Sequence, residues 1–262
     1  MKRYFAISAL GSMTLAAHGA GEEQAVNELI PKLADEKVEN RYAAQMALQD
    51  IASNASKPGN AAARKALGKI LAAKAADPSL PQPARVWIVR QLEYMGGDEA
   101  VEALTKVMNG NDAELRECAR RALEKNPAPA ATASLRAALG KASDATWKIG
   151  LMNSLGQRAD SKSVNLVAKG LGDAKTAPAA ALALGKIADS RAVEALWGAF
   201  GKTPQAGEAL IVAANQIAAK GDTAAAKAIY QKVAEQSKSK SQRAAADFGL
   251  KQADSAKAPR KK

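Results

Sequence analysis

The chain has 262 residues, of which 47% are hydrophobic but only 4% aromatic, with one cysteine, one histidine and a formal net charge of +12. A single cysteine excludes an internal disulfide. The single histidine, His18, lies near the start, so the rest of the chain offers no residue for a histidine-dependent triad or a histidine-ligated metal site.

The first residues have the pattern of a signal peptide. The positive pair Lys2-Arg3 precedes an apolar stretch over residues 4–16, and Ala17 and Gly19 are small residues at the positions that a signal peptidase reads. We expect residues 1–19 to be removed and the mature protein to be periplasmic or secreted; the alternative is an uncleaved interfacial helix. No later stretch reaches the length of an apolar membrane span, so no transmembrane segment is predicted.

The rest of the chain repeats a unit of two apolar-striped helices. The apolar residues that anchor the second helix of each unit are Leu48, Leu92, Leu123, Leu155, Leu184, Ile217 and Leu250, and the last six are separated by 31, 32, 29, 33 and 33 residues. A period of this size is typical of a solenoid. One helix pair cannot bury both of its apolar faces, whereas stacked pairs share a continuous core. The predicted fold class is all-α: a right-handed α/α superhelix of HEAT/armadillo type with about seven helix pairs, over residues 20–253.

The predicted pairs, in chain order, are 26–34 with 38–52, 61–75 with 84–95, 99–108 with 113–125, 130–139 with 145–157, 162–171 with 177–188, 191–200 with 205–220, and 223–236 with 242–252. Gly96-Gly97 predicts a left-handed cap at the end of its helix. The short helix-breaking segments between pairs end in an aspartate: Asp98, Asp160, Asp189 or Asp222. Each of these aspartates is predicted to cap the helix that follows it. Residues 254–262 lack apolar side chains and are predicted to be a disordered basic tail.

Two stretches carry a resemblance to a known family: "GDEAVEALTKVMNGNDAELRECARRAL", from Gly97 to Leu123, and "ADSRAVEALWGAF", from Ala188 to Phe200. They resemble the HEAT repeat family, in particular the short bacterial repeats similar to those of phycobilisome lyases. The resemblance implies an α/α superhelix whose second helices line the inner surface, and it does not imply one activity. The metal-dependent hydroxylases built on HEAT repeats use paired His-Glu motifs, which this chain lacks.

Five second helices carry a basic residue seven positions before the anchor: Arg41, Arg85, Arg116, Lys148 and Arg243. Ala177 and Leu210 interrupt the series. One interpretation is structural: a ladder between repeats, in which each cation binds the aspartate or the carbonyl groups of the neighbouring turn. The other is a basic stripe on the concave face that binds an anionic partner. We favour the structural interpretation because the two interruptions leave a gap in any continuous stripe.

Tryptophan side chains near this series are candidates for contact with a partner. Trp87 and Trp147 lie close to Arg85 and Lys148 on second helices, where they either form a hot spot or fill the core. The candidate partner-binding residues are therefore Arg41, Arg85, Trp87, Arg116, Trp147, Lys148 and Arg243.

The basic surplus is concentrated at the C-terminal end. Residues 201–262 hold 12 basic and 5 acidic side chains, whereas residues 21–200 hold 24 and 21. This end either contacts an acidic polymer or an anionic surface, or is a solvated tail. Nucleic acid is not expected, because the chain is predicted to be exported and the tail has no interleaved aromatic residues.

Together these observations predict an exported, non-catalytic scaffold that binds protein partners along its concave face. No cofactor, metal ligand or catalytic residue is predicted. The alternative is an enzyme accessory similar to bilin lyases, which acts on a chromophore or a covalent modification.

Overall fold

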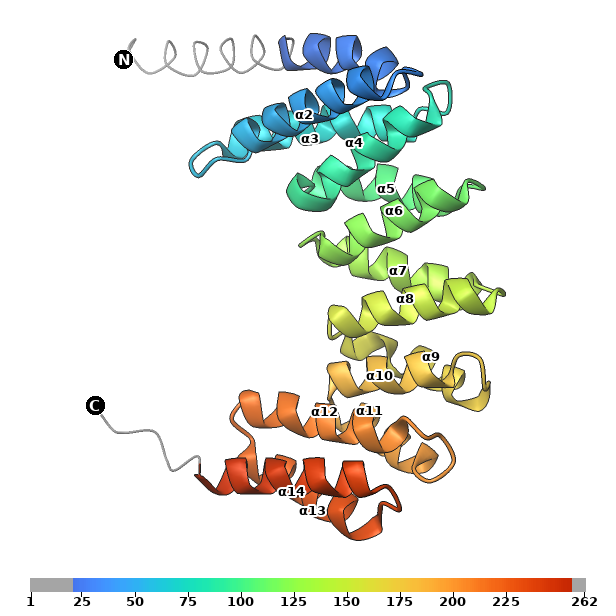
Figure 1. Cartoon of the computed structure of the whole chain (residues 1–262), viewed down its shortest axis with the longest axis vertical. Helices are drawn as coiled ribbons and strands as arrows, with labels where there is room; N and C mark the ends of the chain where they lie inside the picture. The colour runs from blue at the N-terminus through green and yellow to red at the C-terminus, as the bar shows by residue number, and fades with distance from the viewer. Residues whose placement is uncertain (1–20, 256–262) are drawn as a thin grey trace, which may run out of the picture. The chain divides into compact units, whose positions relative to one another are not determined.

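The computed structural model describes residues 21–255, and within that range all the regular elements are helical (Figure 1). Residues 21–33 are helical and are followed by α2 (Val38–Ala55), α3 (Ala61–Ala76), α4 (Gln82–Met95), η1 (Asp98–Ala100), α5 (Val101–Met108), α6 (Ala113–Lys125), α7 (Pro129–Lys141), α8 (Ala145–Gln157), η2 (Ser161–Ser163), α9 (Val164–Ala168), η3 (Lys169–Gly172), α10 (Ala177–Ile187), α11 (Ser190–Ala199), α12 (Ala206–Ala219), α13 (Thr223–Gln236) and α14 (Lys240–Ser255). The predicted signal peptide, residues 1–19, lies outside the described residues, as does most of the predicted tail, residues 256–262.

The predicted fold class, an all-α array of HEAT-type helix pairs, is confirmed. The pairs agree with the sequence prediction to within a few residues, except in the fifth pair. There the expected first helix is divided into η2, α9 and η3. Gly170 and Gly172 weaken helix formation here, and the Thr176 hydroxyl donates a hydrogen bond of 2.8 Å to the Gly170 carbonyl at the end of the segment.

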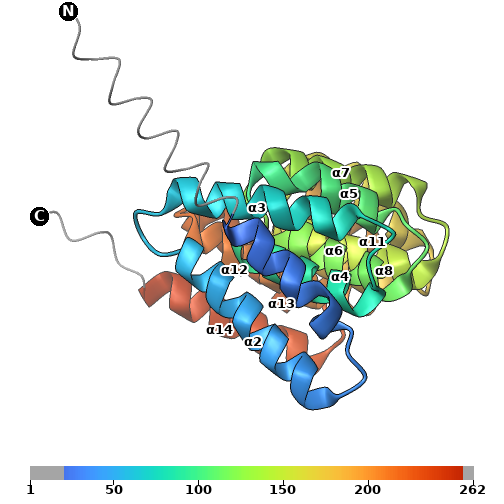
Figure 2. The same cartoon turned by 90° about the horizontal axis from the view of Figure 1, so that it is seen from above.

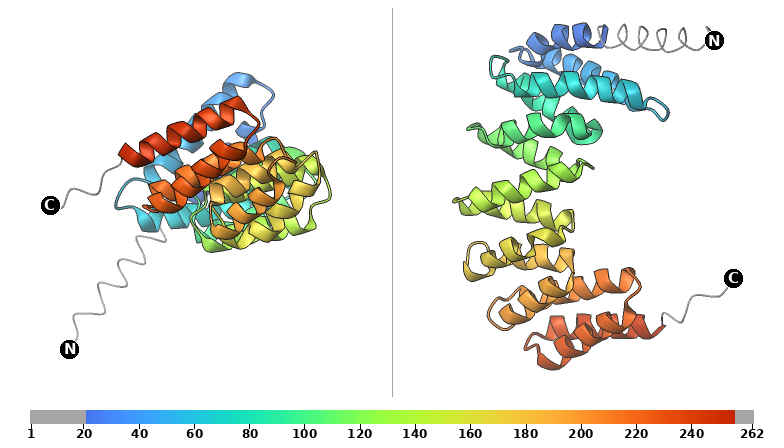
Figure 3. Two further views of the ribbon diagram at one scale, coloured as in Figure 1. Left: turned by 90° about the horizontal axis from the view of Figure 1, so that it is seen from below. Right: turned by 180° about the vertical axis from the view of Figure 1, so that it is seen from behind.

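The chain forms two compact units, with the boundary between Ser134 and Leu135 inside α7. In the first unit α4 packs against α2, α3 and α6, and α3 packs against α5. The second helices α2, α4 and α6 therefore lie on one side of this unit, and α3 and α5 on the other (Figure 2). In the second unit α10 packs against both α8 and α12, and α13 packs against both α12 and α14 (Figure 3).

The core of both units is made mostly of leucine and alanine. The anchors Leu48, Leu92, Leu123, Leu155 and Leu184 are fully buried. The last two anchors, Ile217 and Leu250, are only partly buried. Leu250 lies in α14, the last of the described helices, where fewer layers cover it.

Close backbone packing joins the second helices of the second unit. A Cβ atom at Gly156 would meet Cα of Ala183 at 2.7 Å, and a Cβ atom at Gly185 would meet the Ala209 carbonyl oxygen at 2.7 Å. Since backbone atoms cannot move aside as a flexible side chain can, α8, α10 and α12 reach this separation only with glycine at these two positions.

Two of the helix-breaking segments between pairs combine a residue in the left-handed backbone conformation with a following aspartate. Ala188 and Gly221 have φ values of 51° and 97°, and the following Asp189 and Asp222 accept hydrogen bonds from the backbone N–H groups of Ala192 and Ala225 at 2.8 and 3.0 Å. These two predicted caps are confirmed.

The other two aspartates do not cap a helix through their side chains. Asp98 lies inside η1, and both carboxylate oxygens of Asp160 accept hydrogen bonds from Nη1 of Arg136 at 2.8 Å. The prediction was therefore wrong for Asp98 and Asp160, because a 3₁₀ turn and an ion pair replace the cap.

The prediction of a left-handed cap at Gly96-Gly97 was also wrong. Gly96 has φ −62° and ψ 138°, which is extended backbone. Side chains from other helices bind the carbonyl groups at this helix end. Nε of Arg64 donates to the Met95 carbonyl at 2.7 Å, and the Asn126 side-chain amide donates to the Gly97 carbonyl at 2.9 Å.

Several side-chain bonds link segments that lie far apart in the sequence, within one helix pair for Arg64 and Asn126 and between neighbouring pairs for Arg191. Arg64 and Met95 are 31 residues apart, Asn126 and Gly97 are 29 apart, and the Arg191 side chain donates to the Ser161 carbonyl across 30 residues. Each of these bonds therefore spans about one repeat.

Of the helices between residues 21 and 255, none has the length and apolar character needed to cross a membrane.

Candidate binding site

Three members of the basic series bind carbonyl groups within their own helix pair. Nη1 of Arg41 donates to the Asp35 and Glu36 carbonyls at 2.7 and 2.9 Å. Nε of Arg85 donates to the Ala75 carbonyl at 2.9 Å. These cations stand at the start of the second helix and reach the C-terminal end of the first, where cations are favoured by the helix dipole.

Arg243 repeats the arrangement in the last pair, with Nη1 donating to the Ser237 carbonyl at 2.8 Å. For Arg41, Arg85 and Arg243 the structure thus supports carbonyl binding as the structural role. The predicted ladder between repeats was wrong for these three residues, because each acceptor precedes its arginine by only 5 to 10 residues and the bonds close one helix pair.

The other two members of the series follow N-capping aspartates. The Asp112 carboxylate accepts from the Leu115 N–H at 2.8 Å, one residue before Arg116. The Asp144 carboxylate accepts from the Trp147 N–H at 2.7 Å, one residue before Lys148. The caps place an anion at each helix start and offset the unfavourable position of the cation. Partner binding by the basic series stays a prediction.

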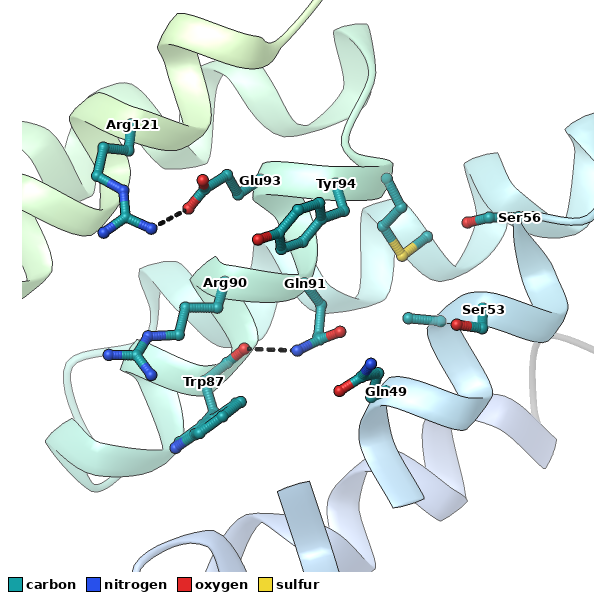
Figure 4. Close-up of a pocket in the computed structure, with 11 residues that line it drawn as sticks. Gln49, Ser53, Ser56, Trp87, Arg90, Gln91, Glu93, Tyr94 and Arg121 are labelled. Carbon is teal, nitrogen blue, oxygen red and sulfur yellow. Dashed lines mark hydrogen bonds and ion pairs between the residues drawn. The ribbon is translucent and has the colours of Figure 1, made fainter. Parts of the chain in front are cut away.

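A groove lies on the second-helix side of the first unit and has a volume of about 570 Å³ (Figure 4). We call it the second-helix groove. It is lined by Gln49, Ala52, Ser53 and Ser56 at the end of α2, by Trp87, Arg90, Gln91, Glu93, Tyr94 and Met95 of α4, and by Arg121 of α6. It therefore spans the second helices of three consecutive repeats.

Helix α4 places its two aromatic residues on the groove through simple helical spacing. Trp87 and Tyr94 are seven residues apart, about two turns, and Arg90 and Gln91 lie between them on the same face. The guanidinium carbon of Arg90 is 4.8 Å from the Trp87 ring centroid, a cation–π contact. Tyr94 is 77% exposed, the highest value among the large hydrophobic residues described.

A buried carboxylate holds two cations at the edge of the groove. The side chain of Glu93 is only 2% exposed and pairs with Nη2 of Arg121 at 2.8 Å and with Nζ of Lys125 at 2.6 Å. Nζ of Lys125 also lies 4.7 Å from the Tyr94 ring centroid. The hydrogen bond to Glu93 raises the pKa of Lys125 above its ordinary value. Burial alone would lower the pKa of Arg121, but Glu93 outweighs this and raises it. Glu93 therefore stabilises the charged forms of both cations.

The cysteine next to this cluster is a poor nucleophile. Cys118 is buried, and burial raises the pKa of its thiol although the Arg90 guanidinium opposes the shift. A thiol in this state is protonated at neutral pH and unreactive. Between residues 21 and 255, no group of three or more His, Cys, Asp and Glu side chains is arranged to hold a metal ion.

Of the seven predicted partner-binding residues, only Trp87 lines the second-helix groove. Arg85 borders a different cavity of about 310 Å³ with Asp112 and Leu115, and Lys148 borders one of about 220 Å³ in the second unit. The prediction missed Arg90, Glu93, Tyr94 and Arg121. The spacing of Trp87, Arg90 and Tyr94 along α4 could have indicated the part of the groove that this helix forms, whereas the pairing of Glu93 with Arg121 depends on how two repeats stack.

The fold and the groove define a class: an all-helical repeat protein with a concave site on its second helices. Residues 84–110 and 179–196 match the PBS lyase HEAT-like repeat family. Each matched segment covers a second helix, in whole or in part, and continues into the first helix of the next pair. This match confirms the HEAT-like resemblance seen in the sequence.

Comparison with curated proteins gives no match. Among solved structures, the chain is similar to human deoxyhypusine hydroxylase in complex with glycerol, at 19% sequence identity over 94% of this chain and 99% of that chain, with a TM-score of 0.35. A likeness at this TM-score carries no argument about activity.

Proposed function

We propose that this protein is an exported, non-catalytic scaffold that binds a protein partner on the second-helix surface. The observation that carries the proposal is the second-helix groove, in which Trp87, Tyr94 and two arginines converge from consecutive repeats. Tryptophan, tyrosine and arginine are the residues most enriched at binding hot spots. Stacked helical repeats provide extended surfaces of the kind that such partners use.

The ion pairs and the burial of the ionisable groups at the groove favour a binding function over a catalytic one. Its only acidic lining residue, Glu93, is held by two cations, and the thiol of nearby Cys118 is buried and protonated. A general acid or base has to reach its substrate with a free proton site. Neither group meets that condition.

Site-specific photo-cross-linking tests the scaffold proposal. A photoreactive amino acid replaces the exposed Tyr94 in the full chain, and the same amino acid at the exposed Lys69 of α3, on the other side of the unit, is the control. Cross-linking is done in the native compartment. We expect one or a few proteins to be captured from position 94 and not from position 69. Capture from neither position, or equally from both, would overturn the proposal.

Export is tested separately by fractionation and N-terminal sequencing. We expect the mature chain to begin at Ala20 and to be recovered outside the cytoplasm. A chain that keeps Met1 and stays in the cytoplasm would overturn this part.

The second candidate is an accessory role similar to that of bilin lyases, and the match to the PBS lyase HEAT-like repeat favours it. This role predicts that the protein purified from its source carries pigment with visible absorbance. The scaffold proposal predicts a colourless protein that captures its partner without turnover.

A further inference from the structure

We infer that the second-helix groove recognises an acidic peptide segment in which an apolar side chain stands next to an Asp or Glu carboxylate. The inference rests on the proposed function and names the chemistry of the partner. It follows from three properties of the groove: an aromatic pair whose member Tyr94 is exposed, a local excess of positive charge, and polar walls that match a peptide backbone.

The aromatic pair provides the apolar contact. Trp87 and Tyr94 lie on the same face of α4, with Ala52 and Met95 also lining the groove. Tyr94 is 77% exposed and so leaves a large apolar surface in contact with water. A partner side chain laid along α4 would cover this surface, which is the main favourable term in such contacts.

The charge of the groove selects an acidic partner. Among the lining residues, Arg90 and Arg121 supply two positive charges against the single negative charge of Glu93, and Lys125, which pairs with Glu93, adds a third cation at the edge of the groove. The Glu93 side chain is 2% exposed and already accepts from two cations, so it presents almost no negative surface. The Arg121 and Lys125 side chains remain 46% and 49% exposed. Their outward N–H groups and those of Arg90 suit a carboxylate.

The polar walls favour a peptide over a small anion. Gln49 and Ser53 of α2 face the groove across from Arg90 and Gln91 of α4 (Figure 4). Amide and hydroxyl groups both donate and accept hydrogen bonds, as the N–H and C=O groups of an extended peptide require. A groove of about 570 Å³ is also large enough for several residues of a peptide.

Matched synthetic peptides test the inference on the full chain. Three fluorescein-labelled dodecapeptides alternate leucine with glutamate, with glutamine or with lysine. Binding is measured by anisotropy, and the emission change of Trp87 is isolated by comparison with Trp87→Phe. We expect the glutamate peptide to bind about tenfold more tightly than the glutamine peptide, with weaker binding at higher salt. Equal affinities for the three peptides would overturn the inference.

Substitutions in the groove locate the effect. We expect Arg90→Gln to weaken binding of the glutamate peptide about five- to tenfold and to leave the glutamine peptide nearly unchanged. Arg90→Glu is expected to shift the preference toward the lysine peptide. Lys69→Gln removes the same charge from the exposed side of α3 and is the matched control. If it weakens binding as much as Arg90→Gln does, the attraction is non-specific and the inference fails.

The outcomes separate this inference from the proposed function. Proteins captured at position 94 through segments without Asp or Glu would overturn the acidic-peptide inference but would still support the proposal of a scaffold. A visible pigment that occupies the groove and excludes the glutamate peptide would overturn both.

Discussion

Glu93 and Arg121, 28 residues apart in the sequence, join α4 to α6 through an ion pair of 2.8 Å at the edge of the groove. The carboxylate is almost completely buried, whereas the guanidinium is 46% exposed. The pair therefore contributes both to the stacking of two repeats and to the charge that a partner meets.

Arg121→Gln should lower the free energy of unfolding by about 1–2 kcal/mol, between the values typical of surface and buried pairs, because Lys125 still neutralises Glu93. Glu93→Gln is expected to cost a similar amount. In urea unfolding the double variant should lose less than the sum of the two single variants, which measures their coupling. Strict additivity would show that the two side chains do not interact in solution.

The arginine that binds the end of the preceding helix should matter for stability in its own pair. Arg85→Met removes the bond from Nε to the carbonyl of Ala75, a residue that is fully buried. We expect a loss of about 1–2 kcal/mol in the free energy of unfolding. Lys69→Met, on an exposed face, should stay within about 0.5 kcal/mol. An unchanged unfolding midpoint in Arg85→Met would show that this residue does not stabilise its helix pair.

Two glycines in helices of the second unit should respond in opposite directions to the same change. Gly185→Ala forces a Cβ atom to within 2.7 Å of the Ala209 carbonyl oxygen, and we expect it to cost about 1–3 kcal/mol. At Gly198 an added methyl group would have no neighbouring atom within 4 Å, so Gly198→Ala should stabilise α11 by up to about 1 kcal/mol. The melting temperatures of the two variants, compared with that of the parent chain, test this prediction. A gain in melting temperature for Gly185→Ala would contradict the close packing of α10 on α12.

Stability should fall at alkaline pH. Burial raises the pKa of the Cys118 thiol and of the Tyr230 phenol above 9.0 and 10.0, and Glu93 raises that of Lys125 above 10.5. In each case the folded state holds its proton more tightly than the unfolded state does. The corresponding stability is therefore complete below these ordinary values and is lost as the pH rises through the folded-state values.

Melting temperatures measured from pH 7 to pH 11 check this prediction, with the decline expected to begin near the ordinary thiol value of 9.0. Cys118→Ala removes the thiol contribution, so its decline should begin at a higher pH than that of the parent chain. A melting temperature that stays constant up to pH 11, or an identical profile for Cys118→Ala, would contradict the assignment.

The helices were predictable because their apolar period and their capping residues act locally. The anchors from Leu48 to Leu184 are buried as the 3.6-residue stripe predicts, and Asp189 and Asp222 cap the helices that follow them. The failures at Asp160 and Gly96 have the opposite origin. Arg136 reaches Asp160 and Arg64 reaches the end of α4 from other helices, and nothing in the local sequence specifies these contacts.

The groove was only partly predictable for the same reason. The spacing of Trp87 and Tyr94 places both on one face of α4, which sequence can show. The contact of Arg121 with the buried Glu93 depends on how α6 is placed against α4 when successive repeats stack. The basic series lies elsewhere: its members precede the anchors by seven positions, and Arg41, Arg85 and Arg243 bind carbonyl groups of their own helix pair.

The side-chain bonds that span about one repeat also have a consequence for how the chain folds. The bonds from Arg64 to Met95, Asn126 to Gly97 and Arg191 to Ser161 each close a loop of 29 to 31 residues. Each unit is thus built from contacts of low contact order, and the entropic cost of closing each loop is nearly the same. Folding can begin at any helix pair and spread to its neighbours, with no single nucleus required.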